Sequence, residues 1–471
     1  MDILIIFALF IVISALITFV FKKKTKFDTY YLITMIKTRK PIPILKAIGQ
    51  KTSLFEFLAE LSIIFGFGAI AADFLYGRKQ SLPRRIITFI TSFAIMAAFF
   101  IVLDLAIGNI FSNGPLTKDV FLIIVFVFGV SGFAGFTLFS LVLQAFDIIL
   151  KLSIGKTACP GVAPLIPGVK VPNVPIVIPL HAWLSLFIIL IIHEGMHGII
   201  ALRHKLKLKS TGIVLLGFLP IAAFVEPKED DLEKLEEKDP KNALKFLAAG
   251  AGGNLLAIPA VFIIILVLSF AVSALFVPWQ NEIVSNSIDG VYVAQVDQNM
   301  NFCGDFYESP SYGVIDVNST ILRVNDVNIN NSLDLQRTLL LNRYKESHFV
   351  LQDTNGTIYE ANLKPNDLGS LGFAVSNNYN DYPIPEDYRL VSYLIALIFD
   401  FLTWLLLLNF LVALVNFLPM SPFDGGKMGK IIFSAYFPFG KNLKEKKKKV
   451  GRLLFAVIIA IILLNMLPLF L

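Results

Sequence analysis

Two histidines and a glutamate share one apolar stretch of this sequence, and their spacing suits metal chemistry. The run His193-Glu-Gly-Met-His197 lies within His181–Leu202, which is long enough for a membrane helix. Residues four apart lie on one face of a helix, so both imidazoles can bind a single zinc ion. Glu194 follows the first histidine and can take a proton from water that the zinc activates.

The same five residues could also be a chance match on the surface of an ordinary helix. A membrane setting argues against chance, because ionisable side chains in a bilayer are costly and usually functional. Three of them occur here within five residues of an apolar run. We therefore predict a zinc site of the kind found in metallopeptidases, with Glu194 as the general base.

A catalytic zinc ion needs a third protein ligand. His181 lies about three turns away on the same helix, His204 sits in a basic run, and His348 belongs to a distant polar region. The remaining source is a carboxylate on another helix. Asp424 follows two prolines and precedes two glycines, a break that at membrane depth is tolerated only in a buried or wet place. Alone, Asp424 would be a turn residue; beside the histidine motif we predict that it binds the metal.

The composition places these residues in a membrane protein. Apolar residues make up 56% of the 471 residues, charged residues only 16%, and the net charge is +6. This balance excludes a disordered chain, a collagen-like chain and an ordinary soluble enzyme. The basic surplus does not require nucleic acid, because membrane proteins concentrate Lys and Arg in cytoplasmic loops. The two cysteines, Cys159 and Cys303, are too few for a disulfide scaffold or a thiolate zinc site; whether they pair is left open.

The fold class that we expect is a polytopic α-helical membrane protein with about eight spans. The first span carries no basic residues in front of it and is expected to be a retained anchor with its N-terminus outside. The candidate spans are Ile3–Phe21, Leu54–Tyr76, Ile86–Gly108, Val120–Phe146, His181–Leu202, Phe246–Val277, Leu390–Leu418 and Leu453–Leu471.

Basic loops predict the orientation. With eight spans, the basic runs Lys22–Lys26, Arg203–Lys209 and Lys441–Lys449 all fall on the cytoplasmic side. The basic loop Gly77–Arg85 falls on the opposite side, which is a conflict. The weakest span is Leu54–Tyr76, because it contains three acidic residues; an interfacial helix or a re-entrant pair is the alternative there.

The late motif Asn416-x-x-Pro419-x-x-x-x-Asp424-Gly, together with the earlier His193-Glu-Gly-Met-His197, resembles the site-2 protease family of intramembrane zinc metalloproteases. The resemblance covers about His181 to Ser434 and implies that Asp424 is the third zinc ligand. It also implies that Asn416 and Pro419 shape the substrate-binding region. A third family element, Gly250-Ala-Gly-Gly-Asn254, implies that Asn254 binds substrate or stabilises the oxyanion; close helix packing would also account for its small residues.

A polar stretch of about 110 residues between Val277 and Leu390 predicts a small domain outside the membrane. Its part Ile283–Lys364 resembles a PDZ domain, although Asn318-Ser319 replaces the usual Gly-Asp turn. Its strand-like runs are Gly290–Val296, Val314–Val324, His348–Gln352 and Thr357–Leu363, around a helical run, Leu333–Leu341. The predicted division is 1–155 for N-terminal spans outside the common core, 156–278 for the first core part, 283–365 for the PDZ-like domain and 386–471 for the second core part.

The resemblance implies a zinc metalloendopeptidase with one zinc ion, which cleaves peptide bonds in or near transmembrane segments of membrane proteins. We expect it in the cell membrane, with the PDZ-like domain outside and the catalytic site nearer the cytoplasmic face. Substrates would first be trimmed by a site-1-type protease. The apolar run Thr211–Val225 is expected to form either a strand pair, whose edge holds an unwound substrate, or a simple re-entrant loop.

Three other functions remain open from the residues alone. A membrane zinc carrier or sensor would need metal ligands along a path, and this chain has few histidines and cysteines. A membrane peptidase of the prenyl-protein-processing kind would have a downstream Glu ligand on a helix. An inactive scaffold would use only its outside domain and would not require the His/Glu/His/Asp set.

Overall fold

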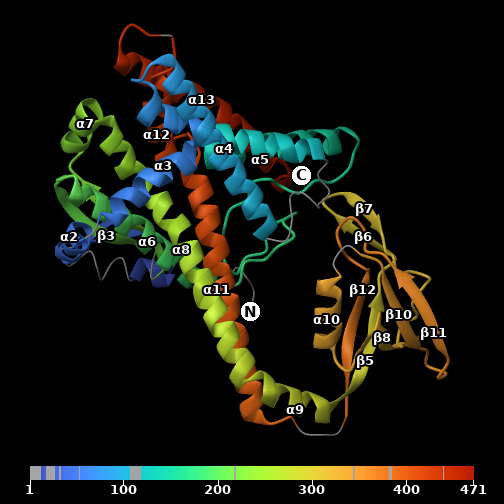
Figure 1. Ribbon diagram of the computed structural model, residues 1–471. Helices are drawn as coiled ribbons and strands as arrows, with labels where there is room; N and C mark the ends of the chain where they lie inside the picture. The colour runs from blue at the N-terminus through green and yellow to red at the C-terminus, as the bar shows by residue number, and fades with distance from the viewer. Residues whose placement is uncertain are drawn as a thin grey trace.

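The computed structural model describes residues 12–16, 27–30, 33–51, 53–106, 118–216, 219–342, 345–380, 384–438 and 440–471. Within these residues, seven helices are long and apolar enough to cross a membrane (Figure 1). They are α3 (Leu54–Ala72) with its continuation η1 (Asp73–Gly77), α4 (Leu82–Ala106), α5 (Lys118–Ser153), α6 (Ala182–Arg203), α8 (Pro240–Leu275), α11 (Glu386–Phe417) and α13 (Leu443–Met466). The chain is thus a polytopic helical membrane protein, and the eighth predicted span, Ile3–Phe21, lies outside the described residues apart from 12–16.

Two of these helices fold back on themselves. In α3, the Tyr76 hydroxyl donates a hydrogen bond to Glu60, although 16 residues of straight helix would separate them by about 24 Å. In α5, a Cβ placed on Gly135 lies 3.4 Å from Val127 Cγ1, whereas eight residues of straight helix span about 12 Å. Each helix is therefore a hairpin of two helical arms, so Leu54–Tyr76 is a pair of arms rather than one straight helix.

Each fold-back occurs at a glycine with a left-handed backbone. Gly68 has φ 60° and ψ −147°, and Gly132 has φ 59° and ψ −151°, a conformation that side chains with a Cβ rarely adopt. The two breaks touch, because a Cβ on Gly68 would lie only 2.6 Å from the Gly132 backbone nitrogen. A buried aromatic cluster surrounds this contact and includes Phe67, Phe128 and Phe133. The hairpins thus meet tip to tip in the core of the membrane domain.

A four-stranded antiparallel sheet packs against α6, in the order β1-β2-β3-β4. Its strands β3 and β4 form the strand pair expected for Thr211–Val225, rather than a simple loop. No described strand pairs with the outer edge of β4. The strands are β1 (Phe27–Tyr30), β2 (Ile33–Thr38), β3 (Leu208–Leu216) and β4 (Leu219–Pro227); the helices that flank them in the chain are α2 (Pro41–Lys51) and α7 (Glu229–Lys238).

The polar stretch forms a separate β-sheet region at the far end of α8 and α11, which run side by side (Figure 1). Its sheet has the order β11-β10-β8-β5-β12, with β9 on β8, and has its own apolar core. The elements are α9 (Val277–Ser287), β5 (Ile288–Val296), β6 (Asn299–Phe302), β7 (Asp305–Glu308), β8 (Thr320–Val324), β9 (Val327–Asn328), α10 (Ser332–Leu341), β10 (Ser347–Gln352), β11 (Ile358–Leu363) and β12 (Phe373–Tyr379).

Two details of this region differ from the sequence prediction. The strand expected over Val314–Val324 begins only at Thr320, because the preceding residues form turns with Asn318 at φ 68°. The sheet also extends past residue 365 to include β12, which pairs with β5. Polar residues at the end of β12 and glycines before it hid this strand in the sequence.

A second attachment joins the sheet region to the membrane domain. Cys159 and Cys303 form a disulfide between the loop after α5 and the hairpin β6–β7. Next to it, Lys151 and Lys156 pair with Asp305 at 2.8 and 3.3 Å. The hydrogen bond from Lys151 holds the pKa of the Asp305 carboxyl below its ordinary value, so this ion pair persists at neutral pH and is lost only in acid.

Candidate metal centre

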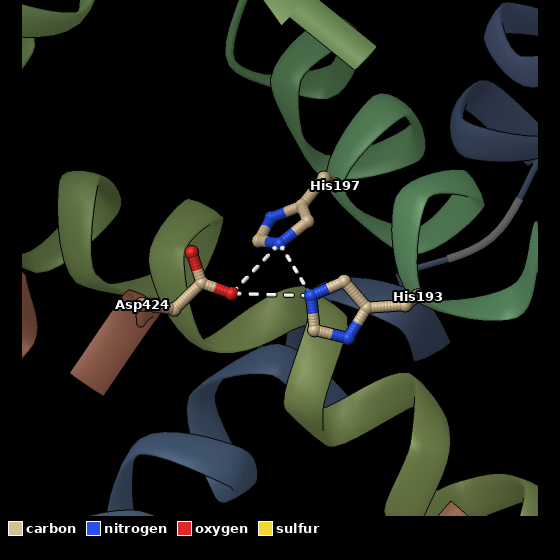
Figure 2. A group of neighbouring side chains, drawn as sticks. All are labelled: His193, His197 and Asp424. Atoms are coloured by element: carbon tan, nitrogen blue, oxygen red, sulfur yellow. Dashed lines mark hydrogen bonds and ion pairs between the residues drawn. The ribbon is translucent and has the colours of Figure 1, made fainter. Parts of the chain in front are cut away.

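Three side chains from two distant parts of the chain converge in the membrane domain (Figure 2). His193 Nε2 and His197 Nε2, one turn apart on α6, are 3.3 Å from each other. Asp424 Oδ2 lies 3.2 Å from the first nitrogen and 3.1 Å from the second. Both histidines are buried and the aspartate is mostly buried. The three residues predicted as metal ligands thus form one compact set of donor atoms.

The spacing of these donors fits a tetrahedral zinc ion. Ligand atoms about 2.05 Å from zinc and at tetrahedral angles lie about 3.3 Å apart, close to the three distances observed. A glycine opens the space in front of the two nitrogens, because a Cβ on Gly250 of α8 would lie 2.4 Å from both Nε2 atoms. The residues present can therefore hold a metal with three protein donors.

The outer nitrogen of each histidine has a partner on α8. His197 Nδ1 lies 2.8 Å from the Phe246 carbonyl oxygen and donates to it, which directs Nε2 to the metal. His193 Nδ1 lies 3.1 Å from the Asn254 side-chain amide. Asn254 Oδ1 is buried and has no hydrogen-bond partner among the described residues, and a half-turn of the amide makes it the acceptor of the Nδ1 proton. Helix α8 thus fixes the orientation of both rings.

A sharp break in the chain places Asp424 opposite the histidines. Helix α11 ends at Phe417, and α12 (Asp424–Ser434) begins at the aspartate itself. Cβ atoms on Gly425 and Gly426 would lie 2.3 and 2.5 Å from the backbone of Phe417 and Met420. The two glycines therefore let α12 start directly against the break, and this close approach sets the position of Asp424.

Glu194 is held by the edge of the sheet. Its Oε2 accepts a hydrogen bond of 2.8 Å from the Val225 backbone N–H on β4. The free edge of β4 therefore faces α6 at the first turn of the motif. Outside the neighbouring residues of α6, no atom of the described residues lies within 4 Å of a Cβ placed on Gly195, the next residue of the motif.

The residues predicted to contact substrate have different surroundings. Asn254 is completely buried behind His193. Asn416 is half-buried and donates to the Val412 carbonyl oxygen of its own helix at 2.9 Å. Pro419 is buried, and a Cβ placed on Gly429 of α12 would lie 2.9 Å from the Cβ of Pro419. All three lie in or next to the elements that carry the metal donors.

Sequence reasoning missed several groups at this centre. The Phe246 carbonyl and the Val225 N–H are backbone groups, which leave no signature in residue types. Gly250 did leave a signal, the run of small residues in α8, but the run was attributed to helix packing or to its asparagine. The need for a glycine directly opposite two ligands becomes visible only when α6 and α8 are side by side.

Comparison with known proteins agrees with this geometry. Residues 181–464 match the family model of peptidase family M50, a stretch that contains all three candidate ligands. The chain is also 26% identical over 323 residues to an uncharacterized protein of Methanocaldococcus jannaschii, an alignment that covers 67% of this chain and 72% of the relative. The region that the family model matches begins just before α6, so α3, α4 and α5 lie outside it.

Proposed function

This chain belongs to peptidase family M50, the site-2 protease family of membrane metallopeptidases, and on that premise we propose that it is a zinc endopeptidase that cleaves membrane proteins in or near their transmembrane segments. The observation that carries the proposal is the triangle of His193, His197 and Asp424 donors at 3.1–3.3 Å, with Glu194 on the same helix. A membrane zinc carrier would not need Glu194 or a closed donor set of this kind.

Each residue of the centre has a role in peptide hydrolysis. A zinc ion on the three donors would supply the positive charge that makes water a nucleophile at neutral pH. The Glu194 carboxylate accepts the proton of the attacking water and returns it to the nitrogen of the leaving amine. Phe246 and Asn254 hold the imidazole rings in the orientation that presents Nε2 to the metal.

The edge of β4 suits an extended substrate. A transmembrane helix shields its own peptide bonds, so the segment to be cut must unwind. Unwound backbone needs hydrogen-bond partners, and an unpaired strand edge supplies them by strand addition. We propose that the substrate adds to β4, whose Val225 contacts Glu194, and that the bond to be cut then lies beside the metal centre.

The β-sheet region offers a second place for a peptide strand. A groove of about 470 Å³ lies between α10 and the edge strand β12 and is lined by Leu335, Leu339, Leu371, Phe373 and Val375. Strand addition at an edge beside a helix is one way in which proteins hold extended peptides and chain ends. We propose that this PDZ-like region binds or filters substrates that a site-1-type protease has already trimmed.

The two helical hairpins support one orientation for the whole chain. If α3 enters and leaves on the cytoplasmic side, the loop Gly77–Arg85 joins Arg203–Lys209 and Lys441–Lys449 there. If α5 enters and leaves on the outer side, the following loop with Cys159 lies outside, together with the sheet region. Every basic loop then obeys the positive-inside rule, and the conflict found with eight simple spans disappears. The catalytic site lies nearer the cytoplasmic face in this arrangement.

Thiol labelling tests this orientation. We expect a membrane-impermeant maleimide to label neither cysteine of the native protein, because disulfides persist in oxidising compartments and Cys159 pairs with Cys303. In the Cys159→Ser variant, Cys303 should be labelled in intact cells. Labelling only after the cells are permeabilised would contradict the outside location of the sheet region.

Metal removal tests the activity itself. Purified protein in detergent should cleave a model transmembrane substrate, lose this cleavage when a strong zinc chelator is added, and recover it with about one equivalent of Zn²⁺. Mass spectrometry of the fragments locates the bond that is cut. Cleavage that persists after complete removal of the metal would contradict a metallopeptidase, and cuts found only in soluble loops far from the membrane would contradict the intramembrane site.

A further inference from the structure

We infer that the hairpin α3, which lies outside the family-matched region, is a positioning element that holds the two halves of the metal centre in register. The inference rests on the proposed metal site. It is argued from two networks of partly buried charges, one on each arm of the hairpin. One network reaches the helices that hold the histidines, and the other reaches the end of the helix that begins with Asp424.

The first arm of α3 binds both α6 and α8. Glu56 accepts from Arg203 Nε at 2.8 Å and from Lys245 Nζ at 2.9 Å. Glu60 takes a second ion pair from Lys245, also at 2.9 Å. The Lys245 side chain is only 6% exposed, and both carboxylates lie within ion-pair distance of its ammonium group. Glu56 thereby ties the end of α6 to the start of α8.

These two attachment points flank a hydrogen bond of the metal centre. Lys245 directly precedes Phe246, whose carbonyl oxygen accepts from His197 Nδ1. Arg203 lies six residues after His197 on the same helix. A relative shift of α6 against α8 would break the His197–Phe246 bond, and the Arg203–Glu56–Lys245 bridge opposes this shift.

The second arm of α3 reaches α12. Asp73 accepts two hydrogen bonds of 2.8 Å from the Arg85 guanidinium and one of 2.7 Å from the Tyr436 hydroxyl. Tyr436 follows the last turn of α12, and Phe433 of that turn packs on Phe67 of α3 with ring centroids 5.9 Å apart. The far end of α12 is thus tied to the hairpin, while its first residue, Asp424, faces the histidines.

The charged groups serve here to fix which residues of neighbouring helices stand opposite each other, rather than to fill space. Burying an ion pair is expensive, and apolar residues of similar size would often stabilise a fold as well or better. Ion pairs and hydrogen bonds have defined partners, however, so they fix which residues stand opposite each other. Two such networks on one rigid hairpin set α6, α8 and α12 relative to each other, and these three helices carry the donors and the groups that orient them.

Two nearly isosteric variants test the inference. Tyr436→Phe removes one hydroxyl, and Glu56→Gln removes one charge while Lys245 keeps Glu60 as its partner. We expect each to weaken Zn²⁺ binding about 3- to 10-fold, somewhat less than the loss of a direct partner of a ligand, as measured by chelator competition. The visible spectrum of the Co²⁺-substituted protein should change in band position or intensity, because the geometry of the donors changes.

The control is Glu236→Gln. This variant breaks a partly buried ion pair with Lys447 at 3.2 Å, which joins α7 to α13, two helices that hold no donor. It should lower thermal stability about as much as the test variants and leave the Zn²⁺ affinity and the Co²⁺ spectrum unchanged. If the two networks only stabilise the fold, all three variants should bind Zn²⁺ with the same affinity.

The outcomes separate the inference from the proposed function. If the wild-type protein binds no zinc, the proposed function itself fails. If it binds one zinc ion and both test variants keep its affinity within twofold with an unchanged Co²⁺ spectrum, only the positioning role is wrong. Weaker Zn²⁺ binding in both test variants, with unchanged binding in the control, supports the inference. If one test variant fails to fold, the Zn²⁺ affinity and the Co²⁺ spectrum of the other decide by the same criteria.

Discussion

The Glu194→Gln variant should bind zinc as well as the wild-type protein and lose about 10³-fold in kcat. Glutamine keeps the size of the side chain, and its amide oxygen can still accept from the Val225 N–H, so the donor set is undisturbed. It cannot take the proton of the attacking water, and general base catalysis typically contributes 10²- to 10⁴-fold. Zinc content is measured by atomic absorption, and kcat and KM by fragment release from a transmembrane substrate.

Glu237→Gln provides the matched control, because Glu237 is exposed on α7 and touches no part of the centre. It should cleave as fast as the wild-type protein. Unchanged cleavage by the Glu194 variant would rule out the proposed mechanism. Loss of zinc together with activity would show that Glu194 supports the metal site rather than the proton transfer.

The helices of the membrane domain were predictable because a bilayer imposes length and apolarity on anything that spans it. The same criterion cannot distinguish a crossing helix from a hairpin, since both are long and apolar. The fold-backs depend on the single residues Gly68 and Gly132, and the segments around them contain other glycines that remain helical. The only sign of the hairpins in the sequence was the basic loop Gly77–Arg85, which eight simple spans would place on the side opposite the other basic loops.

The metal donors were predictable because their chemistry restricts the residue types. Two histidines four apart on an apolar helix are costly at membrane depth unless they bind a partner, and the broken helix before Asp424 marks a place where backbone must be buried. The partners of these donors were not predictable to the same extent. Phe246 and Val225 act through backbone atoms, and Glu56 and Asp73 act through contacts with residues more than a hundred positions away.

The four-stranded sheet also has one part that the sequence predicts and one part that it does not. The pair β3–β4 was one of two structures predicted for Thr211–Val225, because the run is apolar and contains turn-forming residues. Its partner β2 lies 173 to 183 residues earlier, from Thr38↔Thr211 to Ile33↔Leu216, and neither segment contains a pattern that identifies the other as its partner. Strand pairing between distant segments depends on the helices that bring them together, so it follows from the tertiary structure rather than from the local sequence.

The Gly250→Ala variant should fold but bind no zinc. The added methyl group would lie 2.4 Å from both His193 Nε2 and His197 Nε2 and 2.6 Å from His193 Cε1, so it would clash with the imidazole rings. The rings would have to leave the positions that bring the three donors together, so the loss of affinity should exceed the 10- to 100-fold that removal of an outer partner of a ligand typically costs. Displacement of the rings should cost about 1–3 kcal/mol of stability, as measured by thermal unfolding of the metal-free protein.

Gly195→Ala is the matched control, because it adds the same methyl group within the histidine motif at a place where no described residue outside the adjoining part of α6 comes within 4 Å. It should bind one zinc ion with wild-type affinity. Full zinc occupancy in the Gly250 variant would contradict this prediction, because it would mean that the rings can make room for the methyl group and still bind the metal.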